Sequence, residues 1–348
     1  MTERTNLDTT GHRTVESAHS GAAAGARKLR IVDLRTLGPR DLGPLLIDQT
    51  TEWELALDWD FSKSADLVRK SLGARRLGGR AVLDGNEVAG YGYAGVEGNK
   101  GVIGDLYVRP AWRTGNAEET LLRSLFEALA GTAGVRRIEG QLMLVEAAAA
   151  KALQNKHSVG LFERFLMTLD ANTALPLRKG SITAGFRMEP LEDCSHAAAA
   201  AVISTAYGGH VDARIHDRYR TAAQASRFVD ELVHFPGAAF CGAASYIAFD
   251  AATGLPAGIS LSNFVAAEVG HIAELCVMPH SRRAGLGYEL LRQSIQTLRN
   301  AGAKRISLTV TTANESALTL YRRCGFREVR RFYAYVWERS WAGANSRG

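Results

Sequence analysis

The chain of 348 residues contains an internal repeat, which limits it to an architecture of two similar domains. Five residues recur in the same order 169 positions later: Ile103, Leu106, Val108, Pro110 and Arg113 correspond to Ile272, Leu275, Val277, Pro279 and Arg282. One domain ordinarily takes about 100–200 residues, so the length accommodates both copies. We expect domains over residues 29–172 and 183–340, with a linker at 171–181. Residues 1–28, rich in Thr, Ser, Gly and Ala, should form a disordered tail.

The second copy carries a glycine-rich turn between an apolar segment and an amphipathic helix. Residues 282–287 read Arg-Arg-Ala-Gly-Leu-Gly, and the helix that follows places Leu290, Leu291, Ile295 and Leu298 on one side. Backbone N–H groups at a helix start are unpaired and carry partial positive charge, and glycine lets an anion approach the main chain. This arrangement favours a site for a phosphorylated cofactor, but arginine and glycine also occur together in ordinary surface turns.

The order of motifs from residue 269 to 326 resembles the GNAT acetyltransferase family, in its tandem two-domain type. A V-x-P segment, the R-x-x-G-x-G turn, a helix, an apolar strand at 306–310 and then N-x6-Y-x3-G-F follow one another. The resemblance implies acetyl-CoA as co-substrate. It implies that Arg282, Gly285 and Gly287, with the main chain of Arg283, Ala284 and Leu286, wrap the pyrophosphate. It also implies oxyanion donors in the main chain of Leu275, Cys276 and Val277, and a pantetheine contact at Asn314, which suits a helix cap as well.

Acetyl transfer to an amine needs an acid for the leaving thiolate and a base for the amine proton. The family keeps a tyrosine acid at the position of Tyr321, although a helical aromatic of this kind is also typical of a core. Glu274 is our first candidate for the base and His271 the second. In a regular strand these two residues would lie on opposite faces, and a bulge could re-aim either of them. An amine that arrives neutral would need neither.

The same pieces predict the fold class: two mixed α/β domains, each with a mostly antiparallel central sheet flanked by helices. Strands at 270–277 and 305–310 are joined through a helix at 287–300, so they should run parallel. In the family this pair splays apart to admit pantetheine. Residues 331–337 alternate in side-chain character and should form the last strand of the second domain.

The first copy lacks the glycine cradle. Asn116 and Glu118 stand where the second copy has Gly285 and Gly287, and the negative charge of Glu118 would repel a phosphate. Either the first domain no longer binds acetyl-CoA and shapes the substrate cleft, or it holds a looser cofactor turn.

Charge and composition narrow the function classes. The net charge is +6 and the pI about 9.2, but the basic residues are interspersed with acids, so we expect no nucleic-acid partner. The sequence has no long apolar segment, so we expect no membrane span. Four cysteines and nine histidines show no metal-ligand spacing, so we expect no metal, and a reducing cytoplasm fits best.

Two function classes therefore remain. The first is an N-acetyltransferase that acts on a primary amine of a small molecule or peptide. The second is a non-catalytic acyl-CoA-binding sensor or interaction module. In the family the acceptor site draws on the segment that corresponds to 206–236, whose polar residues either line a cleft or form a solvated face: Tyr207, His210, Asp212, Arg214, His216, Asp217 and His234.

Overall fold

The computed structural model describes residues 29–113, 116–172, 185–191 and 196–339. The predicted tail at 1–28 and residues 173–181 of the predicted linker lie outside the described residues. Within the described ranges, no helix combines the length and apolar character needed to cross a membrane.

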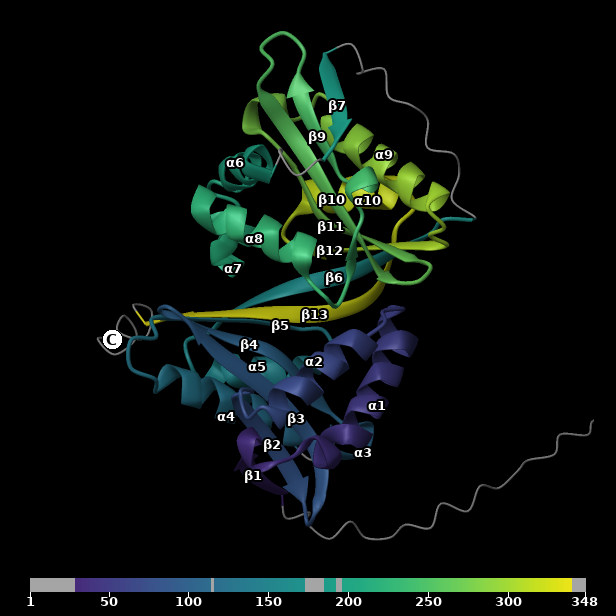
Figure 1. Ribbon diagram of the computed structural model, residues 1–348. Coiled ribbons are helices and arrows are strands. Elements are labelled where there is room, and N and C mark those ends of the chain that lie inside the picture. The colour runs from purple at the N-terminus through teal and green to yellow at the C-terminus, as the bar shows by residue number, and fades with distance from the viewer. Residues whose placement is uncertain (1–28, 114–115, 173–184, 192–195, 340–348) are drawn as a thin grey trace, which may run out of the picture.

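Two halves of the chain repeat one order of elements (Figure 1). The N-terminal half contains β1 (Leu29–Asp33), α1 (Pro39–Leu57), α2 (Ser62–Gly73), β2 (Gly79–Asp84), β3 (Glu87–Glu97), β4 (Lys100–Val108), α3 (Pro110–Arg113), α4 (Ala117–Ala130), β5 (Arg137–Leu142), α5 (Ala147–Lys156) and β6 (Gly160–Asp170). The C-terminal half contains β7 (Phe186–Pro190), α6 (His196–Ala206), α7 (Asp212–Ile215), α8 (Ala222–His234), β8 (Ala239–Phe240), β9 (Tyr246–Asp250), β10 (Pro256–Ala266), β11 (Val269–Val277), α9 (Leu286–Asn300), β12 (Arg305–Thr311), α10 (Glu315–Arg323) and β13 (Arg327–Glu338). The predicted repeat is therefore a repeat of structure.

A single mixed sheet runs through both halves in the order β1-β2-β3-β4-β5-β13-β6-β12-β11-β10-β9-β7. Each half adds its last strand to the other half: β13 pairs with β5, β6 pairs with β12, and β6 and β13 pair with each other. The prediction of a strand at 331–337 is confirmed. Its expected place within the second domain was wrong, because this strand lies between β5 and β6.

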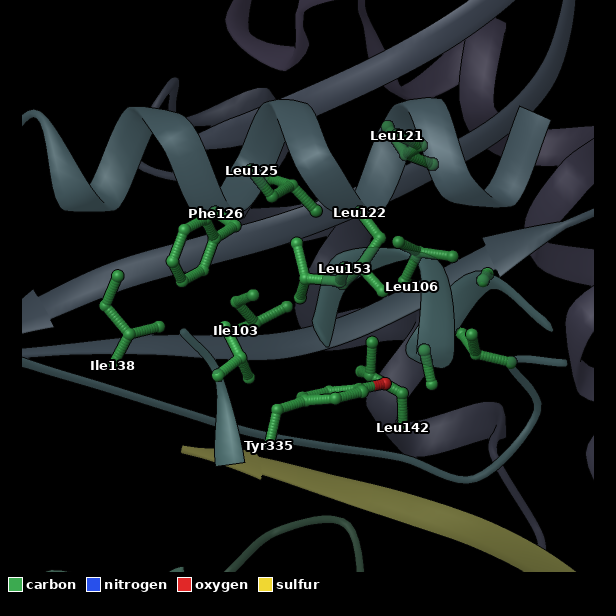
Figure 2. Close-up of a cluster of buried hydrophobic side chains, with 14 of the residues drawn as sticks. Ile103, Leu106, Leu121, Leu122, Leu125, Phe126, Ile138, Leu142, Leu153 and Tyr335 are labelled. Carbon is green, nitrogen blue, oxygen red and sulfur yellow. The ribbon is translucent and has the colours of Figure 1, made fainter. Parts of the chain in front are cut away.

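The exchanged strands also complete the cores of the halves that receive them. Tyr335 of β13 packs among side chains of β4, β5, α4 and α5 in the first half (Figure 2). In return, Phe165, Met167 and Leu169 of β6 pack with α9, α10 and β12. Each buried aromatic or aliphatic side chain of this kind contributes about 1.5–3 kcal/mol. The two halves are therefore joined by their cores as well as by backbone hydrogen bonds.

The parallel pair predicted in the second half is present and splays apart. Strands β11 and β12 pair only from Val269 with Arg305 to Ile272 with Leu308, although β11 continues to Val277 and β12 to Thr311. The sheet is otherwise mostly antiparallel, with helices on both faces, which confirms the predicted fold class. The strands therefore part next to the glycine-rich turn.

Candidate active site

A cleft of about 630 Å³ opens where β11 and β12 part. Most of the residues that the sequence assigns to the site line it: Leu275, Cys276, Val277, Arg282, Arg283, Gly285, Gly287, Asn314 and Tyr321. The remaining four lie elsewhere. Ala284 is exposed and Leu286 turns into the core with Leu290. His271 lines a different cavity, and Glu274 is buried behind Tyr207.

The glycine-rich turn has the backbone that an anion site requires. Gly285 is the N-cap of α9 with φ of 79°, a left-handed conformation that favours glycine, and no side chain caps the helix. The first N–H groups of this helix are therefore available to a ligand. A Cβ on Gly287 would meet Val277 at 3.6 Å and Leu320 at 3.9 Å, which are ordinary van der Waals contacts, so the position is not closed by a clash.

The guanidinium of Arg282 is engaged by protein carbonyl groups. Its Nε donates to the Val277 oxygen at 3.2 Å and its Nη2 to the Ala206 oxygen at 2.6 Å. Arg113 makes the corresponding bond in the first half, from Nε to the Val108 oxygen at 2.8 Å. Arg282 therefore holds the turn against β11 and α6, and the groups of the turn that remain free for an anion are main-chain N–H groups.

Two residues, one at the N-cap of α10 and one within the helix, line the cleft on the side away from the glycine-rich turn. Asn314 caps the helix, since its Oδ1 accepts from the Ala317 N–H at 3.2 Å, and it lines the cleft as well. Tyr321 is 7% exposed and packs in the core, yet it also lines the cleft. Burial, and then the negative charge of Glu274, raise the pKa of Tyr321, so its hydroxyl stays protonated at neutral pH.

A β-bulge brings the two candidate bases to one face of the sheet. Leu261 pairs with Glu274 and Ser262 with Ile272, so Ala273 is an extra residue in β11. Asn263, which pairs with His271, shares a face with Leu261 because the two lie two positions apart. Glu274 and His271 therefore point to the same side, although a regular strand would have placed them on opposite sides.

Glu274 has a buried carboxylate held by a cleft residue. Its Oε1 accepts from the Tyr207 hydroxyl, and from the Leu275 N–H at 3.2 Å, whereas its Oε2 is buried without a partner among the described residues. Burial raises the pKa of Glu274, opposed by the Tyr207 hydrogen bond and the charge of Arg218. Because Tyr207 lines the cleft, a proton from the cleft can reach Glu274 through that hydroxyl.

His271 is a weaker proton acceptor. Its Nδ1 lies 2.9 Å from the Ser307 hydroxyl, and the Trp59 ring of the other half meets it edge-on at 4.9 Å between centroids. Burial lowers the pKa of His271 to about 4. A base with so low a pKa binds a proton weakly at neutral pH. Glu274 is therefore the better candidate for the general base.

The matching position in the first half is filled by a carboxylate. Asn116 caps α4 with φ of 60°, as Gly285 caps α9. Glu118 is 3% exposed, accepts from the Glu146 N–H at 3.0 Å, and pairs with Arg113 at 3.3 Å. Its side chain therefore bridges α4 to the start of α5, the space that corresponds to the cleft between α9 and α10.

The buried Glu118 predicts a pH-dependent stability. Burial raises its pKa from an ordinary value near 4.5 to about 7. Between these values the unfolded chain releases a proton that the folded chain keeps, so the free energy of unfolding falls as pH rises from about 4.5 to 7. Relative to Glu118→Gln, the free energy of unfolding of the wild type should fall by up to about 3 kcal/mol over this range.

Urea unfolding at pH 5 and pH 7.5 measures this difference. Glu119→Gln is the control, because Glu119 pairs with Lys156 at the surface. Parallel pH profiles for wild type and Glu118→Gln would contradict the prediction.

The polar residues of 206–236 divide between clefts and surface. Tyr207 and His210 line the cleft beside β11, whereas His216 and Asp217 line a second cleft between the halves. Arg214 and His234 line neither cleft. The Arg214 guanidinium lies over the Phe162 ring, and the His234 Nδ1 is hydrogen-bonded to the Asp230 carbonyl oxygen. Sequence reasoning missed Arg218 and the tryptophans Trp53 and Trp59, because the cavity that they line has walls from both halves.

Comparison with known proteins agrees with this geometry. Residues 215–326 match the acetyltransferase (GNAT) family. The chain is 35% identical over 66 residues to N-alpha-acetyltransferase 30 of Schizosaccharomyces pombe, which covers 19% of this chain and 44% of that protein. It is 35% identical over 69 residues to an N-alpha-acetyltransferase of Sulfurisphaera tokodaii, covering 19% and 41%. The chain thus spans less than half the length of these relatives.

Solved structures match nearly the whole chain. A GCN5-related N-acetyltransferase from Sphaerobacter thermophilus gives a TM-score of 0.64 at 14% identity, over 89% of this chain and 95% of that one. A tandem GNAT protein from the clavulanic acid biosynthesis pathway gives 0.60 at 15% identity, over 90% and 99%. Residues 215–326 are therefore similar to the acetyltransferase (GNAT) family, and the whole chain has the fold of a tandem GNAT protein.

Proposed function

We propose that this protein transfers an acetyl group from acetyl-CoA to a primary amine of a small molecule or peptide, in its C-terminal half. The observation that carries the proposal is the cleft at the parting of β11 and β12. It joins an uncapped helix start, an αL glycine and a buried tyrosine hydroxyl in one space. The same position in the first half is closed by Glu118, so we propose a single acetyl-CoA site per chain.

The residues of the cleft supply what acetyl transfer requires. The amine nitrogen forms a bond to the thioester carbonyl carbon, the carbon–sulfur bond breaks, the amine gives up one proton and the sulfur gains one. Tyr321 donates the proton to the sulfur. Glu274 takes the amine proton through the hydroxyl of Tyr207 or through water. Main-chain N–H groups of β11 beyond its last pair with β12 stabilise the carbonyl oxygen as charge develops on it.

Glu274→Gln tests the base. Glutamine keeps an oxygen that can accept from Tyr207 but cannot accept the amine proton. We expect turnover at pH 7 to fall by about 10²–10⁴-fold. The loss should shrink as pH rises, because more of the amine is then already neutral.

The measurement is CoA release from acetyl-CoA with a panel of amines, with slow acetyl-CoA hydrolysis as the first assay. Glu268→Gln is the matched control, since Glu268 precedes β11 and pairs with Lys304 at the surface. A protein that binds acetyl-CoA but releases no CoA with any amine would be a binding module, and the proposed transfer would be wrong.

A further inference from the structure

A second cavity, of about 340 Å³, lies between the two halves and we call it the inter-half cavity. Its walls are aromatic and come from both halves: Trp53, Trp59, Phe61 and Tyr93 from the first, Phe228 and Phe235 from the second. Trp53 stacks on Phe61 at 4.9 Å and lies 5.7 Å from Trp59. Such walls bury a flat apolar group of a small molecule.

The first half is fastened to the second at this cavity. The Asp60 N–H donates to the Val265 oxygen of β10 at 2.9 Å, and Asp58 pairs with Arg305 of β12 at 2.8 Å. The segment between α1 and α2 therefore covers strands that belong to the second half.

The inter-half cavity reaches the gap where β11 and β12 part. Ala273 and Thr309 line the cavity, and each lies one residue beyond the last paired residues, Ile272 and Leu308. The cleft proposed for acetyl-CoA is lined from Leu275 onward. A molecule in the inter-half cavity can therefore reach the thioester through the gap between the strands.

Arg218 lines this cavity close to the charges of Glu274 and Glu139, but it makes no direct ion pair with either of them. Its guanidinium lies over the Phe228 ring at 4.3 Å and over the Tyr219 ring at 5.1 Å. No carboxylate of the described residues lies within ion-pair distance of it, and its Nε is buried without a partner. Neighbouring cations differ, since Lys100 pairs with Asp217 at 2.9 Å and Arg137 pairs with Glu139.

A buried guanidinium nitrogen without a hydrogen-bond partner is unfavourable. An anion in bidentate contact with the guanidinium would offset the cost of removing that cation from water. The two acids of the cavity already have partners. Asp105 accepts from Gln49 at 2.6 Å and from the Leu106 N–H at 2.8 Å, and Asp60 accepts from the Ser62 N–H at 2.8 Å. An anionic ligand in the cavity would therefore give Arg218 the direct partner that the described residues do not supply.

We propose, resting on the transferase function above, that the acceptor is a small amine that carries a carboxylate and an aromatic body. An aromatic amino acid is its simplest form. The carboxylate pairs with Arg218, the ring lies between the tryptophans and Phe228, and the amine points to the gap at Ala273 and Thr309. Arg218 and the first half would then set which amines are acetylated.

Calorimetry in the presence of CoA tests this proposal without turnover. L-Phenylalanine should bind wild type about 10–100-fold more tightly than phenethylamine, which lacks only the carboxylate, as expected for a charge-assisted hydrogen-bonded pair. Arg218→Gln should remove that preference while phenethylamine affinity stays within about threefold. Arg218→Lys should keep part of it. Arg227→Gln is the control, because Arg227 is exposed on α8 and lines only the neighbouring cleft.

Three results would count against the inference. If wild type binds the acid and the amine equally, or binds neither, the acceptor has no carboxylate for Arg218. If Arg218→Gln weakens the binding of both ligands alike, Arg218 only shapes the cavity. Acetyl-CoA binding is titrated separately on the same samples. Its absence in wild type would overturn the proposed function, whereas its presence with no carboxylate preference would overturn this inference alone.

Discussion

Acetyl-CoA should bind once per chain, and Gly287→Glu should abolish that binding. The substitution copies Glu118 of the first half, whose carboxylate closes the corresponding space. A glutamate at 287 would place a negative charge beside the uncapped start of α9, where phosphates are expected, and would take its N–H groups for itself. The backbone should tolerate the change, because a Cβ at Gly287 meets only ordinary van der Waals contacts.

Isothermal calorimetry measures the number of sites and the affinity. Gly287→Ala is the matched control, since it adds only a Cβ that meets ordinary contacts, and it should keep affinity within about tenfold. Two equivalent sites in wild type, or full affinity in Gly287→Glu, would refute the assignment.

Tyr321→Phe should lower turnover by about 10²–10⁴-fold while acetyl-CoA affinity changes little. The ring remains, so its packing with Phe326 and the rest of the core survives, and only the proton for the leaving sulfur is lost. Because burial raises the pKa of this tyrosine, the wild-type hydroxyl remains protonated through the neutral range.

Tyr288→Phe is the control for that experiment, since Tyr288 lines the same cleft from α9. Wild-type turnover in Tyr321→Phe would mean that the tyrosine is core packing and the sulfur takes its proton from water. Loss of acetyl-CoA binding in the same variant would give it a structural role instead.

Local patterns predicted the repeat, the fold class and the place of the glycine-rich turn. Spacing reveals them because a strand, a glycine turn and a helix of fixed length leave fixed intervals, as between Ile103 and Ile272 or Arg113 and Arg282. The same patterns could not reveal the extra residue at Ala273. A bulge changes which residues pair across the strands, but it changes the alternation of apolar residues in the sequence too little to be recognised.

Local sequence patterns also could not predict which strands pair with one another in the sheet. The alternation in 331–337 identifies a strand, but it does not determine the choice of neighbours, and both of them, β5 and β6, belong to the first half. Contacts such as Trp59 with His271 join residues more than 200 positions apart, and they depend on that choice. The cavity around Arg218 follows from it and was missed for the same reason.

The exchanged strands order the events of folding. While the chain emerges from a ribosome, β5 is available early, but its partner β13 is made last, about 200 residues later. Until then the first half exposes the β5 edge and the core surface that Tyr335 will cover. Pairings of such long sequence separation form slowly, so neither half should reach its native state before synthesis of the other is complete.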